Sequence, residues 1–132
     1  MKNTYEIIAF SETCGDKFFT IAITNQEGET HTDIFSAITL MKFISNRKSP
    51  EFTVDEENEE LVHELGELGF IEVALDQDGS TGAAVYDIYF HKFFVAANGV
   101  LEYDGAGEFM KSYKREQAAL NFANKQKYPV FY

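Results

Sequence analysis

The chain has almost no cysteine and no long apolar run, and each shortage excludes a class of protein. Among its 132 residues there is one cysteine, Cys14, so no disulfide can form within the chain. The amino-terminal segment lacks the apolar core of a signal peptide, and no apolar run approaches the roughly 20 residues of a bilayer-spanning helix. We therefore expect a cytoplasmic protein that does not associate with membranes.

Positive charge is missing from the middle of the chain, and the formal net charge is −11. Residues 51–90 hold twelve Asp and Glu residues and no Lys or Arg. Residues 1–50 hold five basic and six acidic residues, and residues 91–132 hold six and four. The negative charge is therefore concentrated in the middle segment, which disfavours direct binding to nucleic-acid phosphates and favours a basic protein partner.

The common cofactor and metal motifs are also missing. The sequence contains no G-x-x-x-x-G-K-[ST], G-x-G-x-x-G, H-E-x-x-H or C-x-x-C pattern. Residues 76–87 resemble a calcium loop only in part, because Thr81 stands where such a loop needs glycine and Asp87 where it needs glutamate. We therefore predict no cofactor, no metal and no catalytic residues.

What the chain does contain is a composition typical of globular proteins, with 45% hydrophobic and 15% aromatic residues. Its length fits a single domain over residues 1–132. Periodicity and turn residues predict an α+β fold, in which about three helices pack on an antiparallel sheet. The strands are expected at 4–10, 17–24, 70–75, 85–97 and 100–103, and the helices near 33–46, 54–68 and 112–127.

Two segments of the chain share a pattern that suggests an internal repeat. The segments from Tyr5 and from Tyr86 both read Tyr, acid, Ile and later Lys-Phe-Phe, followed by a turn and a helical pattern. One interpretation is a pair of ββα units, residues 4–48 and 84–127, with the acidic helix and a strand at 53–76 between them. The other is two unrelated hairpin and helix units.

Local signals predict where several elements begin or end. Thr32 or Asp33 is expected to cap the first helix, and Ser112 or Tyr113 to open the last. Thr53 and Glu56 have the spacing of a capping box, and Gly69 is expected to cap the acidic helix in the left-handed region. The Asn98-Gly99 pair predicts a two-residue hairpin turn with positive φ at both positions.

The acidic helix is the most unusual feature of the sequence. The segment from Val54 to Leu68 carries seven carboxylates and no Lys or Arg. At helical spacing, Glu56, Glu60, Glu64 and Glu67 share one stripe, where like charges are destabilising by about 0.2–0.5 kcal/mol per pair. We predict that these four residues bind a partner. The alternative is a solvated helix face that only provides solubility.

A second candidate site lies on one strand. Asp87, Tyr89 and His91 alternate, so their side chains share a face, and such a trio could hold a general base oriented by a carboxylate. This arrangement is the basis of an alternative function, a small enzyme or ligand-binding protein. A polar row facing solvent, opposite a row of core residues, explains the same pattern.

The last five residues, 128–132, read YPVFY and are too apolar to remain unpacked in a monomer. They could add a strand to a neighbouring copy, which would make the protein a homo-oligomer or a structural or assembly subunit. Deletion of these residues should therefore reduce either stability or self-association.

Taken together, the residues predict a non-enzymatic, acidic, protein-binding module. The expected partner is a basic protein that handles nucleic acid, which the module would inhibit or neutralise as toxin antidotes and anti-defence proteins do. This expectation rests on the physics of a negative surface that imitates spaced phosphates.

Overall fold

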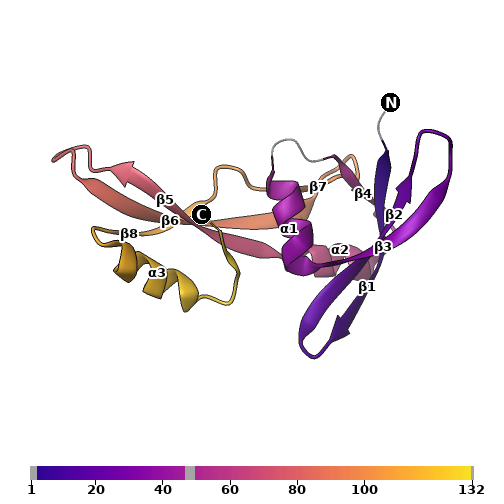
Figure 1. The fold of residues 1–132 in the computed structure, drawn as a ribbon, viewed down its shortest axis with the longest axis horizontal. Coiled ribbons are helices and arrows are strands. Elements are labelled where there is room, and N and C mark those ends of the chain that lie inside the picture. The colour runs from indigo at the N-terminus through magenta and orange to yellow at the C-terminus, as the bar shows by residue number, and fades with distance from the viewer. Residues whose placement is uncertain (1–2, 47–49, 132) are drawn as a thin grey trace. The chain divides into compact units, whose positions relative to one another are not determined.

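A computed structural model describes residues 3–46 and 50–131 of the chain and shows an α+β protein (Figure 1). These residues form three helices and nine strands in two sheets. The helices are α1 (Ala37–Ser45), α2 (Glu59–Gly66) and α3 (Glu116–Asn124). The strands are β1 (Thr4–Thr13), β2 (Asp16–Thr24), β3 (Thr30–Ser36), β4 (Phe52–Val54), β5 (Gly69–Gln77), β6 (Ala84–Val95), β7 (Leu101–Tyr103), β8 (Glu108–Tyr113) and β9 (Val130–Phe131).

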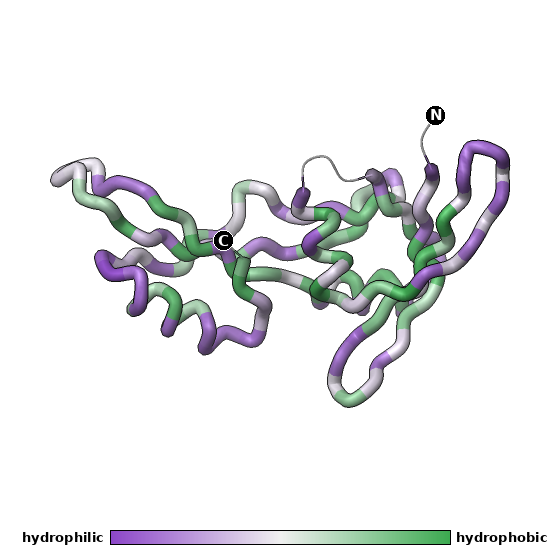
Figure 2. The backbone as a smooth tube through the Cα atoms, in the orientation of Figure 1, coloured by the Kyte–Doolittle hydropathy of each residue, from purple (hydrophilic) through white to green (hydrophobic). Residues whose placement is uncertain are grey.

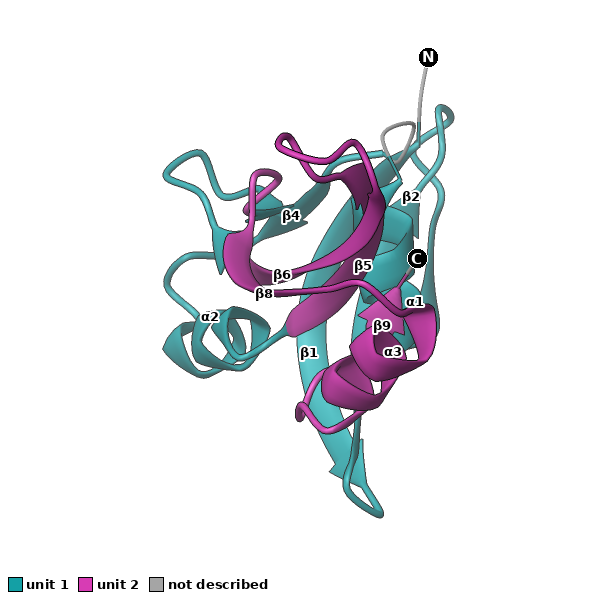
Figure 3. Ribbon diagram, turned by 90° about the vertical axis from the view of Figure 1, so that its left-hand side faces the viewer, with its two compact units in different colours: residues 1–68, 93–103 teal, residues 69–92, 104–132 magenta. Residues whose placement is uncertain are grey.

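The chain forms two compact units, and strand β6 contributes residues to both (Figure 3). Unit 1 comprises residues 1–68 and 93–103, and unit 2 comprises residues 69–92 and 104–132. Each unit is described by itself below. The single domain over residues 1–132 stays a prediction.

Both sheets are mixed, whereas the sequence predicted one antiparallel sheet. The first sheet has the order β3-β2-β1-β4, and the second has the order β7-β6-β5-β9 with β8 also paired to β6. The hairpin-connected strands are antiparallel, but β4 runs parallel to β1 and β9 runs parallel to β5. Both parallel strands follow a helix, and a helical connection lets a strand enter its sheet in the parallel direction.

Unit 1 begins with a tight hairpin. Cys14 and Gly15 have φ values of 53° and 82°, and they join β1 to β2 as a two-residue loop. Positive φ at both positions matches the right-handed twist of the strands that this loop connects. The Cys14 side chain is exposed.

The predicted start of the first helix is wrong by several residues. Thr32 and Asp33 lie in β3, which pairs with β2 over its whole length. Helix α1 starts after Ser36, whose Oγ accepts a hydrogen bond from the backbone N–H of Thr39 at 3.2 Å. Pairing with β2 satisfies the backbone of residues 30–36, so the chain stays extended past the first polar residues that could cap a helix.

The core of unit 1 lies between its sheet and α1. Phe19, Ile21 and Leu40 are fully buried, and Phe52 from β4 is 1% exposed. Aromatic rings join these elements: the Phe43 ring lies 6.5 Å from that of Phe52 and stacks on Phe35 at 5.3 Å.

The turn between β6 and β7 differs from its prediction. Of the Asn98-Gly99 pair only Gly99 has a positive φ, of 80°. Its backbone N–H donates to the Ala96 carbonyl at 2.9 Å, and the N–H of Ala96 donates to the carbonyl of Val100. The loop therefore has three residues and ends in a glycine bulge, which is the next most common hairpin connection after the two-residue turn.

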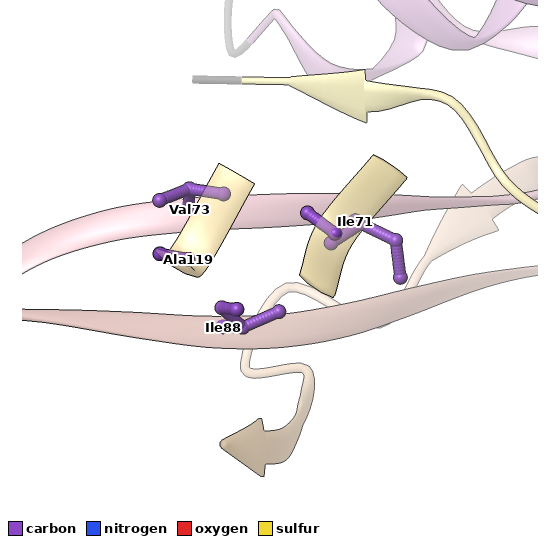
Figure 4. Close-up of a cluster of buried hydrophobic side chains, with 5 residues drawn as sticks. Ile71, Val73, Ile88 and Ala119 are labelled. Carbon is purple, nitrogen blue, oxygen red and sulfur yellow. The ribbon is translucent and has the colours of Figure 1, made fainter. Parts of the chain in front are cut away.

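Unit 2 is built on the antiparallel hairpin of β5 with the first part of β6, and α3 covers one face of it. Alternation along the strands places apolar residues on this face, and Figure 4 shows Ile71, Val73, Ile88 and Ala119 gathered there. Ala119 and Ala123 are fully buried, and their small side chains let the helix backbone approach the sheet. Hydrophobic and hydrophilic residues accordingly alternate along α3 in Figure 2.

The last helix also begins later than predicted. Ser112 and Tyr113 belong to β8, which pairs with β6, and α3 starts after Arg115 without a side-chain cap. The three helices have eight or nine residues each. Within residues 3–46 and 50–131, no helix has the length and apolar character to cross a membrane.

The internal repeat is not confirmed. In the first segment Tyr5 lies in β1 and the Lys-Phe-Phe triplet in β2, whereas both matching features of the second segment lie in the single strand β6. The carboxyl-terminal residues do find a place. Val130 and Phe131 form β9 beside β5, and the Phe131 ring stacks on Phe70 at 4.7 Å. Tyr132 lies outside the described residues.

Candidate functional site

The acidic segment of unit 1 begins in a strand and not in a helix. Thr53 lies in β4, beside β1, and its Oγ1 donates to the carbonyl of Tyr5 at 3.2 Å. Helix α2 starts after Asn58, whose Oδ1 accepts from the N–H of Leu61 at 3.3 Å. The predicted capping box of Thr53 and Glu56 is therefore wrong, because pairing with β1 keeps Thr53 extended and Asn58 caps the helix instead.

The carboxyl end of α2 also differs from its prediction. Gly69 is the first residue of β5, and it is absent from the glycines with positive φ. A Cβ at this position would lie 2.6 Å from Cε1 of Phe90, so the glycine lets the Phe90 ring pack on the strand. Close approach of a ring, and not a left-handed cap, explains why glycine suits this position.

Leucines fix the orientation of α2. Leu61, Leu65 and Leu68 are at most 6% exposed, which anchors one side of the helix in unit 1. Most of the carboxylates lie away from this side. Six of the seven acidic residues of the segment are exposed: Asp55, Glu56, Glu57, Glu59, Glu60 and Glu67.

The four predicted binding residues do not form one stripe. Glu56 lies in the turn before α2, while Glu60 and Glu67 lie on the helix or at its end and are exposed. Glu64 is different, because its Oε2 lies 2.7 Å from Nζ of Lys17 and its side chain is only 20% exposed. Glu64 therefore has a basic partner, although the acidic segment itself contains no Lys or Arg. Lys17 is distant in sequence, so helical periodicity could not reveal the pair.

One histidine adjoins the exposed acids. His63 Nε2 lies 3.4 Å from Oε1 of Glu67, one helical turn further on, and both side chains are more than half exposed. When His63 is protonated, this contact reduces the negative charge at the end of α2. The negative surface is therefore formed by the turn at residues 55–57 and by Glu59, Glu60 and Glu67.

The alternative site in unit 2 has a different arrangement from the one predicted. His91 is 4% exposed, and its Nε2 lies 2.9 Å from Oε1 of Glu72 on the neighbouring strand β5. Its Nδ1 lies 2.6 Å from the carbonyl oxygen of Asp104. Sequence reasoning missed Glu72, although the β5–β6 hairpin could have revealed it, since Glu72 pairs with Tyr89 two residues from His91.

Both ring nitrogens of His91 thus lie within hydrogen-bonding distance of an oxygen atom. Gly107 also lies against the ring, because a Cβ on this residue would be 2.7 Å from Cε1 of His91. A general base needs a nitrogen that can reach a substrate proton. These contacts describe a histidine that holds a loop to the sheet.

Tyr89 has a perturbed acidity of a simple origin. Burial raises the pKa of its phenol, and the carboxylates of Asp87, Asp76 and Glu72 raise it further. A phenol that ionises less readily is a weaker proton donor. This shift is therefore the consequence of negative surroundings, and it gives Asp87 and Tyr89 no evident catalytic pairing.

The segment that resembles a calcium loop is organised by its own side chains. Asp78 Oδ1 accepts from the backbone N–H of Ser80 at 2.8 Å and from its hydroxyl at 2.7 Å, and the bond from the hydroxyl lowers the pKa of Asp78 most. Gly82, with φ of 71°, completes the turn back into β6. In the described part of the chain, no three His, Cys, Asp or Glu side chains come together as a ligand set.

Comparisons with family models, with curated proteins and with solved structures give no match to this chain. The exposed carboxylates around α2, the buried His91 contacts and the Asp78 turn are therefore interpreted from their own chemistry. The carboxylates around α2 are exposed and lie largely outside a network of internal hydrogen bonds, whereas Asp78 is bonded to Ser80 and His91 lies against Glu72 and Asp104.

Proposed function

We propose that the protein is a non-enzymatic, acidic binding module for a basic protein. The observation that carries this proposal is the set of six exposed carboxylates at residues 55–67; the seventh acid of the segment, Glu64, pairs with Lys17. Exposed like charges at this density destabilise the free protein slightly. A partner that supplies Lys or Arg side chains relieves that repulsion and gains charge-assisted hydrogen bonds.

The geometry suits a partner that normally handles nucleic acid. Helix α2 has eight residues, so it extends for about 12 Å at 1.5 Å per residue. At about 3.4 Å per base pair, this length corresponds to between three and four steps of a DNA duplex. A groove that accepts phosphates can accept carboxylates that lie this close together, so we propose that the module occupies that groove and inhibits or neutralises the partner.

The proposal includes a location and excludes two other modes of binding. We place the protein in the cytoplasm, where nucleic-acid-handling partners are abundant. Direct binding to nucleic acid is disfavoured by the negative surface itself. We do not build the proposal on self-association through the tail, because Val130 and Phe131 already pair with β5 in their own unit.

Capture of partners from the source cell, followed by mass spectrometry, tests the proposal first. The identified complex is then measured with the Glu60→Gln/Glu67→Gln variant. Its association rate at low salt should fall several-fold, and the dependence of that rate on salt should become weaker. Dissociation should change less, because exposed charges act mainly on encounter.

A matched control removes the same number of charges elsewhere. Glu27 and Glu29 are exposed in the turn between β2 and β3, so Glu27→Gln/Glu29→Gln changes the net charge equally without touching α2. Its association rate should fall much less than that of the α2 variant. Equal rates for the two variants would show that only net charge matters and would defeat the proposed role of α2.

A further inference from the structure

Unit 2 contains a cavity that is separate from the acidic segment. It has a volume of about 360 Å³ and lies among β6, β8, α3 and the loop that follows α3. This volume is within the range of pockets that bind small ligands or single side chains. The lining residues that matter here are four aromatic residues and two polar ones: Phe90, Phe109, Phe122, Tyr128, Glu108 and Gln126.

We call this cavity the aromatic pocket, because four of its lining residues are aromatic. Tyr128 is 38% exposed, and its ring lies 4.6 Å from that of Phe90. The ring of Phe109 instead lies 5.7 Å from that of Tyr89, on the other face of the sheet, so Tyr128 is the ring that a ligand of the pocket can reach. Ring faces attract cations, and Arg is the side chain that most often stacks on them. The same part of the chain already shows such a contact, because Nζ of Lys111 lies 5.7 Å from the centre of the Phe122 ring.

The polar atoms of the pocket favour a ligand rich in hydrogen-bond donors. Glu108 is the single charged residue in the described lining, and its carboxylate only accepts. The Nε2 of Gln126 donates a hydrogen bond to the carbonyl of Phe122 at 3.1 Å. The other polar atom of this side chain, Oε1, is a hydrogen-bond acceptor. A guanidinium is planar, positively charged and carries five donors, which matches flat ring faces beside a carboxylate.

We propose that the aromatic pocket receives an arginine side chain of the basic partner. The guanidinium stacks on the ring of Tyr128 and pairs with the carboxylate of Glu108. Across the strands, Glu108 pairs with Phe90, the neighbour of the Tyr128 ring. That the arginine belongs to the basic partner rests on the proposed function. The affinity of the pocket for a guanidinium does not depend on it. The pocket thus supplies a specific anchor, while the exposed carboxylates of α2 supply attraction at longer range.

The test uses the full chain and a small probe. N-acetyl-arginine amide is titrated into isotope-labelled protein, and the amide resonances of residues 108, 109 and 128 are followed by NMR. We expect saturable shifts with a dissociation constant on the order of millimolar, as suits a single side chain. The citrulline analogue, which keeps the shape but lacks the charge, should bind at least about 5-fold more weakly.

Variants locate the binding. Glu108→Gln and Tyr128→Ala should each weaken the binding of the arginine probe several-fold, and neither removes a buried side chain. Glu116→Gln, at the exposed start of α3, removes the same charge outside the pocket and should leave binding unchanged. Thermal melting of each variant checks that the fold is kept.

Several results would overturn the proposal. Shifts that do not saturate or that lie elsewhere, equal binding of the citrulline or lysine analogue, or equal effects of Glu108→Gln and Glu116→Gln each contradict an arginine pocket. Failure of the proposed function looks different. If the arginine probe binds while the Glu60→Gln/Glu67→Gln variant associates with its partner at the parental rate, the pocket stands and the role of α2 falls.

Discussion

Lys17 at the start of β2 and Glu64 in α2 form an ion pair, with 2.7 Å between Nζ and Oε2. Both side chains are less than one-third exposed, so solvent screens the pair less than a fully exposed one. The pair attaches the acidic helix to the first sheet of unit 1. Glu64 therefore has a structural role, unlike the exposed carboxylates on which the proposed function depends.

A double-mutant cycle of Lys17→Met and Glu64→Gln should therefore detect a coupling of about 0.5–1 kcal/mol in the free energy of unfolding. Glu60→Gln should leave this free energy unchanged or raise it by a few tenths of a kcal/mol, because it removes repulsion from an exposed position. Urea unfolding measures both. A coupling energy of zero would mean that the pair does not hold α2 in place.

Gly107 should tolerate substitution less well than Gly82. Both have positive φ, of 74° and 71°, so alanine introduces similar backbone strain at each. Only at Gly107 would the new Cβ meet His91, whereas nothing lies within 4 Å at Gly82. Gly107→Ala should lower the free energy of unfolding by about 1–3 kcal/mol more than Gly82→Ala. Equal losses would show that the ring of His91 moves aside freely.

The carboxyl-terminal residues should stabilise unit 2 from within one chain. Phe131 is half-buried and stacks on Phe70, and the N–H of Ile71 donates to the carbonyl of Pro129 at 2.8 Å. Phe131→Ala should lower the free energy of unfolding by about 1–3 kcal/mol, and the more exposed Phe109→Ala by less. Deletion of residues 128–132 should lower the free energy of unfolding further without changing the oligomeric state of the protein in solution. A deletion variant of parental stability would contradict this packing.

Tyr89 should make the protein less stable in alkali. Its pKa is raised in the folded state by burial and by the carboxylates of Asp87, Asp76 and Glu72, so the unfolded chain ionises first as pH rises. The stability contributed by the neutral phenol is complete below its ordinary pKa of about 10 and is lost as pH rises through the raised value. Unfolding free energies between about pH 9 and 11 should fall more steeply for the parent than for Tyr89→Phe.

A second variant checks the cause of that shift. Asp87→Asn removes one neighbouring charge, so the tyrosinate absorbance of the folded protein should develop at lower pH than in the parent. An unchanged titration would show that the charge of Asp87 does not contribute to the shift.

The sequence predicted the strands and hairpins better than the starts of the helices. Alternation of apolar residues located β5 and β6, and the turn at Cys14-Gly15 formed where two β-rich runs met. Thr32, Thr53 and Ser112 each look like a helix cap in isolation. All three lie in strands, because a backbone that finds a neighbouring strand to pair with gains more hydrogen bonds than one side-chain cap provides.

In the candidate site, too, the sequence predicted features that depend on neighbouring residues and missed contacts between residues that are distant along the chain. Periodicity along α2 identified the buried leucines and the exposed Glu60 and Glu67. It could not identify Lys17 as the partner of Glu64, nor Glu72 as the partner of His91, because these contacts depend on how strands meet. The aromatic pocket was missed for the same reason, since Phe90, Phe109 and Tyr128 are separated along the chain.

The division of the chain into two units has a consequence for how such a protein can be inherited. The backbone passes between the units three times, after residues 68, 92 and 103, and β6 runs from one unit into the other. Neither unit is one continuous stretch, so no single cut in the gene releases either as a complete segment. A recombination event with a single breakpoint therefore cannot exchange one unit intact and leave the other unchanged.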